Sequence, residues 1–215
     1  MRKFVRFAFI LLLGRFIFGA DPTYTRLFFT PTAFTLRAGE GYFSVYEVIF
    51  PSLTVGLTGF ADIAGGVSMA PGASDQFFYL APKLKFFHQG NFAVAAGALY
   101  VAPLKEFSGG GGFVYGVFTV GNRNSSFTFG LAWPFIKTDI SDKSIILLGG
   151  SLPLSRNLKF ITENYIFPGG SSLLSGGFRF YTGKLSVDFA LAYPTGHHGG
   201  FPFIPWLGFS YKFHL

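Results

Sequence analysis

The stretch LSVDFALAYP (residues 185–194) alternates between two kinds of side chain. One face of an extended chain would carry large apolar residues, namely Leu185, Val187, Phe189, Leu191 and Tyr193. The other face would carry small or polar residues, namely Ser186, Asp188, Ala190 and Ala192. A period of two is typical of a β-strand, and this contrast between faces is typical of a strand that crosses a membrane within a barrel.

Other segments share the pattern. Residues 125–133 and 203–215 alternate in the same way, whereas 112–121 and 143–152 are apolar on both faces, which leaves their orientation open. Six apolar runs end in a proline, at Pro51, Pro71, Pro103, Pro134, Pro168 and Pro194. Proline cannot donate to a strand ladder, so it marks the point where pairing ends. Each interval between prolines has room for one hairpin with strands of roughly 9–11 residues.

This repeat predicts an all-β fold, a transmembrane antiparallel up-and-down β-barrel of about 12 strands, with 10 or 14 as alternatives. The last strand would lie beside the first. Connections after the prolines are mostly long, and those at the opposite end are short, as in bacterial outer-membrane barrels. A soluble β-sandwich is the competing fold. It would need a polar outer face, and only 13% of the 215 residues are charged.

The amino terminus has the layout of a secretory signal peptide over residues 1–20, because Arg2, Lys3 and Arg6 precede an apolar stretch. Four of the 17 basic residues lie there, so the remaining 13 face 10 acidic residues and the formal charge falls from +7 to +3. No basic face for nucleic acid remains. We predict a lead or lumen arm over residues 21–40, with an extra strand as an alternative for 26–36, and the barrel over 41–215.

With this pattern the chain resembles Gram-negative outer-membrane β-barrel proteins. Their final strand carries an assembly signal, a glycine followed at three and five positions by aromatic or apolar residues, and Gly208, Tyr211 and Phe213 have that spacing. The stretch 31–50 also resembles the opening of uncharacterised bacterial outer-membrane proteins. The resemblance implies a location in the bacterial outer membrane, contact with its lipid, and assembly by the barrel insertion machinery. It implies no solute, and the oligomeric state stays open.

Candidate catalytic residues are few. The adjacent His197 and His198 have no third ligand nearby, and the glycine run 109–112 leads into a strand rather than a helix. The chain has no cysteine, which excludes thiolate metal sites and cysteine nucleophiles. We therefore expect no enzyme activity, no metal and no cofactor.

We predict one strand over residues 41–50, with Tyr46 and Val48 facing outward. Alternation places six charged side chains inside the barrel, namely Glu47, Lys83, Lys85, Arg179, Asp188 and Lys212. On the lipid face a Lys or Arg would cost about 2–4 kcal/mol near the bilayer midplane. A two-residue turn at Gly183–Lys184 also sets Arg179 opposite Asp188, which predicts an ion pair. We expect a narrow pore for passive or weakly anion-preferring passage of small solutes. The alternatives are a plugged barrel with a structural or surface-interaction role and, less favoured, an outer-membrane lipid enzyme.

Overall fold

The computed structural model describes residues 21–106, 109–196 and 203–215, so the predicted signal peptide and the pair His197 and His198 lie outside the described residues. All the regular elements within the described ranges are strands. They are β1 (Glu40–Tyr46), β2 (Phe50–Thr58), β3 (Ala61–Val67), β4 (Phe77–Gln89), β5 (Phe92–Pro103), β6 (Gly111–Gly121), β7 (Ser126–Ile136), β8 (Asp139–Ile140), β9 (Ile145–Ser155), β10 (Leu158–Ile166), β11 (Ser172–Thr182), β12 (Leu185–Thr195) and β13 (Ile204–His214).

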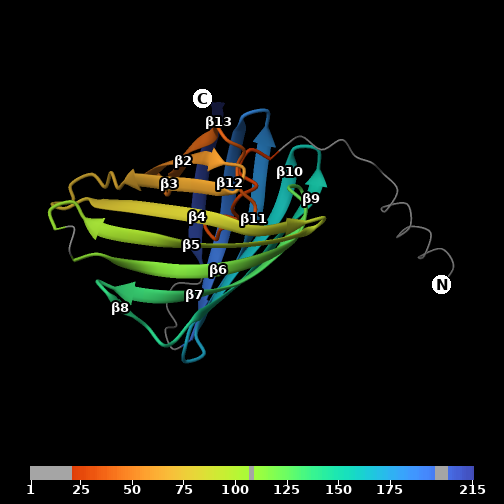
Figure 1. The fold of residues 1–215 in the computed structure, drawn as a ribbon. Helices are drawn as coiled ribbons and strands as arrows, with labels where there is room; N and C mark the ends of the chain where they lie inside the picture. Colours follow the sequence, from red (N-terminus) through yellow and green to blue (C-terminus); the bar gives the residue numbers. More distant parts are fainter. Residues whose placement is uncertain (1–20, 107–108, 197–202) are drawn as a thin grey trace.

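Twelve of these strands close into a barrel. Each pairs in antiparallel fashion with its neighbours in the chain, β1 pairs with β13, and β6 pairs with β7. The two-residue β8 only adds to the end of β7, inside a loop. Figure 1 shows β4–β7 crossing β11–β13 at a steep angle, as tilted strands on opposite walls of a barrel do. The predicted twelve-stranded barrel, with its last strand beside its first, is confirmed.

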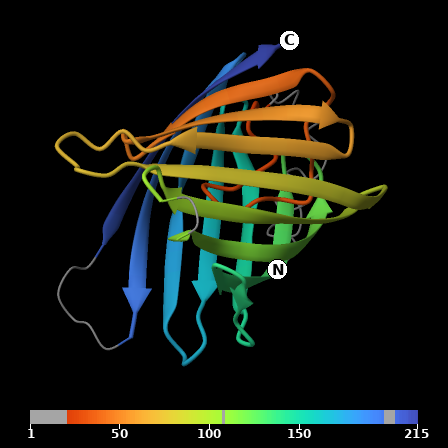
Figure 2. The same cartoon turned by 60° about the vertical axis from the view of Figure 1, so that its left-hand side comes forward.

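All six prolines lie at one end of the barrel, which we call the long-loop end. Its connections include residues 68–76, 104–110 and 137–144, and the loop between β3 and β4 projects well beyond the wall (Figure 2). At the other end, the short-turn end, β4 joins β5 and β11 joins β12 through two residues each. The asymmetry predicted from loop length is therefore present.

The predicted strand over residues 41–50 is wrong, because β1 ends at Tyr46. Glu47 and Val48 have φ angles of 49° and 66°, so the chain reverses there and Phe50 begins β2. Tyr46 consequently faces the interior, together with Tyr42 and Ser44, although the alternation argument placed it outside. A left-handed conformation costs about 1–2 kcal/mol for an ordinary residue. Without the Gly or Asn that such turns prefer, the sequence carries no signal for this one.

The outer surface is apolar over most of the barrel height. Phe127, Phe129, Val187 and Phe189 are between 39% and 50% exposed on this surface, and each alternates with an inward residue. Such a face suits lipid hydrocarbon. Within the described residues, no helix is long and apolar enough to cross a membrane.

The topology predicts which loops contact the medium outside the cell. Cysteine introduced at Ser74 or Asp142, both in connections at the long-loop end, should react with a membrane-impermeant maleimide in intact cells. Cysteine at Asn122 or Lys184, in turns at the short-turn end, should react only after the outer membrane is permeabilised. Labelling in the reverse order would mean that the barrel is inserted the other way round.

Candidate functional site

The interior of the barrel holds the segment that precedes β1. Residues 21–39, which we call the arm, run inside the wall rather than forming a strand of it, as the red trace in Figure 2 shows. Thr23, Leu27 and Leu36 are at most 1% exposed. An isolated bridge between Arg26 and Pro31 closes a small loop in the middle of the arm. The arm therefore fills part of the lumen in which we expected a narrow pore.

Small residues on the wall make room for the arm. Ala93 and Ala95 of β5 are fully buried in the same apolar cluster as Ala33 and Phe34 of the arm. At Gly56 of β2 the fit is closer still, because an added Cβ would lie 2.3 Å from the carbonyl oxygen of Arg37 and 2.8 Å from the Cβ of Leu36. Any larger side chain at Gly56 would push against the arm.

The predicted pair of Arg179 and Asp188 lies at the centre of a buried ion network. The two residues are opposite each other in the β11–β12 register, and Nε of Arg179 is 2.6 Å from Oδ1 of Asp188. The arm adds Asp21, whose Oδ2 is 2.8 Å from Nζ of Lys159 and 3.2 Å from Nη1 of Arg179. It also adds Arg26, whose Nη1 is 3.1 Å from Oδ2 of Asp188. Wall and arm thus neutralise each other's charges.

Electrostatics favour ionised Asp21 in this setting. Burial by itself would raise the pKa of Asp21, but the cations Arg179 and Lys159 reverse that effect and hold the pKa well below its usual range. A depressed pKa means that this contribution to stability is present above the ordinary Asp range and is lost only in strong acid. Asp21 therefore remains ionised and paired with Arg179 in the physiological pH range. Nearby, burial raises the pKa of Tyr24, so its hydroxyl stays a donor.

Glu163 of β10 holds the middle of the arm by its backbone. One oxygen, Oε2, accepts hydrogen bonds from the N–H groups of Phe28, Phe29 and Thr30, at 2.8, 2.9 and 3.0 Å. The other, Oε1, accepts one from the hydroxyl of Tyr165 at 2.5 Å. Three amides converging on one carboxylate oxygen keep the loop against the wall, because hydrogen bonds to a charged acceptor are the stronger ones.

Lys83 of β4 holds the arm from the opposite wall. Its Nζ donates to the carbonyl oxygens of Thr25, Thr32 and Phe34, at 3.1, 3.3 and 2.6 Å, and lies 3.4 Å from Oδ2 of Asp62. Lys83 is therefore not free to meet a passing anion.

The other sequence-predicted residues occupy separate places. Lys85 faces the interior near the short-turn end, and Lys212 pairs with Glu40 at 3.0 Å. Glu47 lies in the β1–β2 turn, where its Oε1 accepts a hydrogen bond from the N–H of Leu207. On β13, Gly208 lies against Asp188, and Tyr211 is exposed on the outside.

Phe213 of β13 lies beside β1, and a Cβ at Gly41 would touch its ring. The sequence interpretation missed Asp21, Arg26, Lys159 and Glu163. No alternation argument applies to the two arm residues, and the inward phase of β10 was not assigned.

A cavity of about 770 Å³ extends from the arm to the long-loop end. The arm residues Thr25–Pro31 contribute to its floor, and every barrel strand contributes to its wall. Most of its lining is aliphatic or aromatic, and the phenylalanines are Phe28, Phe29, Phe50, Phe77, Phe113 and Phe167.

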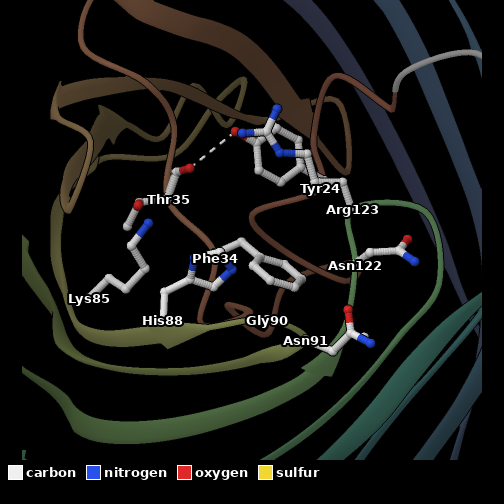
Figure 3. Close-up of a pocket in the computed structure, with 10 residues that line it drawn as sticks. Tyr24, Phe34, Thr35, Lys85, His88, Gly90, Asn91, Asn122 and Arg123 are labelled. Atoms are coloured by element: carbon white, nitrogen blue, oxygen red, sulfur yellow. Dashed lines mark hydrogen bonds between the residues drawn. The ribbon is translucent and has the colours of Figure 1, made fainter.

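On the other side of the arm lies a pocket of about 260 Å³ at the short-turn end, and its lining includes the cationic side chains Lys85 and Arg123. Figure 3 shows Lys85, His88, Asn91 and Arg123 around it, with Tyr24 of the arm beside Arg123. The guanidinium of Arg123 lies 4.4 Å from the centre of the Tyr24 ring. The arm therefore separates an apolar cavity from a cationic pocket.

Comparison with known proteins supports the fold. No protein-family model matches the sequence, and no curated protein does either. Among solved structures, the KdgM porin in complex with disordered oligogalacturonate has a TM-score of 0.62 and 8% sequence identity, over 81% of this chain and 98% of that one. The KdgM porin alone gives 0.61 at the same identity and coverage, and the NanC porin gives 0.49. The two KdgM structures show that this chain has the fold of an outer-membrane porin, as the resemblance implied.

The ion network predicts a stability cycle. Asp188→Ala should lower the free energy of unfolding by about 3–5 kcal/mol, because two guanidinium groups lose their shared carboxylate. Arg179→Ala should lower the free energy of unfolding less in the Asp188→Ala background than in the wild type. The loss in the double variant should therefore be smaller than the sum of the two single losses by about 1 kcal/mol or more. Urea unfolding in micelles, followed by heat-modifiable gel migration, measures this, with Val187→Ala on the lipid face as a control. Purely additive losses would contradict the network.

The contact at Gly56 predicts a way to displace the arm. In a background with Ala33→Cys, the single thiol should be protected from maleimide, because Ala33 is fully buried. Gly56→Ala should raise its labelling rate at least tenfold, since the new Cβ meets only arm atoms at its closest approach. Gly116→Ala is the matched control, because a Cβ there meets nothing within 4 Å. Equal labelling in both variants would show that the arm does not yield at Gly56.

Proposed function

We propose that the protein is an outer-membrane channel for small solutes, closed by its own N-terminal arm in the conformation described here. The observation that carries the proposal is the seating of the arm across the lumen, between the apolar cavity and the short-turn pocket. A solute that enters from the long-loop end meets the loop at residues 26–31 before it reaches the other side.

The way in which the arm is attached supports a gate rather than a fixed core. The arm continues into the barrel wall only through Gly39 and β1, and none of its residues belongs to a barrel strand. It is held by ion pairs and hydrogen bonds, which water can replace when a segment leaves, as well as by apolar contacts of Phe34 and Leu36. Release would therefore leave the ladder of twelve strands intact.

Weak anion preference fits the charges at the short-turn mouth. Lys85 and Arg123 line the pocket there, while Lys212 is balanced by Glu40. Fixed positive charge at a narrow mouth with low-dielectric walls enriches anions. Deeper in the lumen the cations Lys83 and Arg179 are already bound by the arm and by carboxylates. The proposed preference therefore resides at the mouth.

A second candidate function is a permanently plugged barrel with a structural role, favoured by the close fit of the arm at Gly56. The related KdgM fold does not decide between the two. That porin was solved with oligogalacturonate, a polyanionic sugar, whereas the wide half of this lumen is apolar. Only the motion of the arm separates a gated channel from a plugged barrel.

A reversible lock tests the gate. The side-chain oxygens of Thr23 and Ser186 are 3.3 Å apart, so Thr23→Cys with Ser186→Cys should form a disulfide between arm and wall in a chain that has no other cysteine. In planar bilayers the oxidised variant should show no openings, and a reductant should restore the wild-type opening frequency. Deletion of residues 21–35 should raise conductance severalfold further.

The controls address selectivity and folding. In the deletion background, Lys85→Glu with Arg123→Glu should shift the reversal potential in a salt gradient toward cations, whereas Lys143→Glu in a connection at the long-loop end should leave it unchanged. Heat-modifiable migration on gels reports that each barrel is closed. If the correctly folded deletion variant conducts no ions, the plugged barrel is the right description.

A further inference from the structure

We infer that the cavity above the arm is a binding site for a small apolar molecule that carries one hydrogen-bond acceptor, such as a long-chain alcohol or ester. The volume of about 770 Å³ lies within the range of about 300–1,000 Å³ typical of small-molecule sites. This inference does not depend on whether the arm moves, because the cavity is formed with the arm in place.

The lining offers nothing to a charged or sugar-like ligand. Of the charged residues that line it, Glu163 is occupied by three amides and a tyrosine, and Lys83 by three carbonyl groups and Asp62. Arg26 is paired with Asp188, and Glu47 accepts the N–H of Leu207. A charged guest would lose water without meeting an unpaired charge of opposite sign, which is costly.

An apolar guest, by contrast, lowers its free energy when it moves from water into the cavity. Phe77, Phe113, Ile145 and Leu147 turn inward at the level of the cavity, where water finds few partners. Transfer of hydrocarbon from water contributes about 25 cal/mol for each Å² buried, so an alkyl chain or an aromatic ring is the favoured occupant. Apolar engineered cavities take up such guests for the same reason.

Two hydrogen-bond donors at the cavity wall are the reason why the inferred ligand carries an acceptor. Nε of Arg26 and Nε1 of Trp206 are buried without a hydrogen-bond partner among the described residues, and both side chains line the cavity. The third such atom of the lining, Oδ2 of Asp62, is an acceptor whose charge is balanced by Nζ of Lys83 at 3.4 Å. The side chains of Arg26 and Trp206 both lie beside Tyr46. The Arg26 guanidinium is 4.8 Å from the centre of the Tyr46 ring, and the centre of the Trp206 ring is 5.8 Å from it. A buried donor without a partner costs about 1–3 kcal/mol. An oxygen on the ligand would relieve one of them.

The two tryptophans of the chain make the test direct. Trp206 lines the cavity, whereas Trp133 follows the inward Ala132 on β7 and faces the lipid. Trp133→Phe therefore leaves a reporter in the cavity, and Trp206→Phe leaves a reporter on the outside. Both variants are placed in vesicles of unbrominated phosphatidylcholine and titrated with 9,10-dibromooctadecan-1-ol, whose bromine atoms quench nearby indole rings.

Binding predicts saturable quenching of Trp206 to less than half its starting fluorescence, while quenching of Trp133 rises in proportion to the probe dissolved in the bilayer. Vesicles of acyl-brominated phosphatidylcholine distinguish the source of the alkyl chain. If they quench only Trp133, the site takes a free molecule, and if they also quench Trp206, it takes a lipid chain.

A filled cavity supplies the matched control. Ala192→Phe places a ring inside the cavity, and Val187→Phe places the same ring on the lipid face of the same strand. Only Ala192→Phe should lower the affinity of Trp206 quenching, by tenfold or more. The inference is overturned if the alcohol quenches Trp206 without saturation, or if aqueous iodide quenches it freely, since the cavity would then be an open water channel. Equal affinity in both phenylalanine variants would overturn it too.

Discussion

A charge inside a membrane barrel must have a partner, and in this protein the partners come from two distant parts of the chain. Arg179 has Asp188 on the next strand, but its guanidinium also binds Asp21 and the carbonyl oxygens of Thr23, Arg26 and Leu27 in the arm. Without the arm, Arg179 and Lys159 would share too few acceptors. Without these cations, Asp21 would be a buried carboxylate with no counterion. The barrel wall and the arm are therefore one electrostatic unit.

This dependence divides the lumen into two environments. Polar contacts gather where the arm meets the wall, and the half toward the long loops keeps an aromatic and aliphatic lining. Ion-selective pores present charged side chains or carbonyl groups to the permeating solute. Here the charges are used to hold the arm, and the open volume is left to apolar side chains. The seated arm and the apolar cavity are consequences of the same arrangement.

Much of the barrel was predictable because its information is local. The alternation at residues 185–193 fixes the phase of β12, and the tight turn at Gly183 fixes its register with β11. Two strands resisted interpretation for a physical reason. The segments 112–121 and 143–152 are apolar on both faces because β6 and β9 turn Phe113, Tyr115, Ile145 and Leu147 toward the cavity. The second apolar face of each segment therefore marks the wall of the cavity.

The candidate site was less predictable. Asp21 and Lys159 are 138 residues apart and share no periodic pattern, so neither identifies the other from the sequence. The turn at Glu47 and Val48 was missed because its conformation is unfavourable for both residues. Small inward residues such as Ala93 and Ala95 did indicate spare room in the lumen, but the pattern of the wall alone does not say what occupies that room.

The position of the arm at the start of the chain has a consequence for assembly. Many of its anchors lie on β10, β11 and β12, late in the chain, although Lys83 on β4 also holds it, and contacts of such long sequence separation slow folding. Asp21 and Arg26 pair with side chains that come 138 to 162 residues later in the chain. The arm is thus made before the strands that hold it, and its place in the lumen depends on strands from both halves of the barrel.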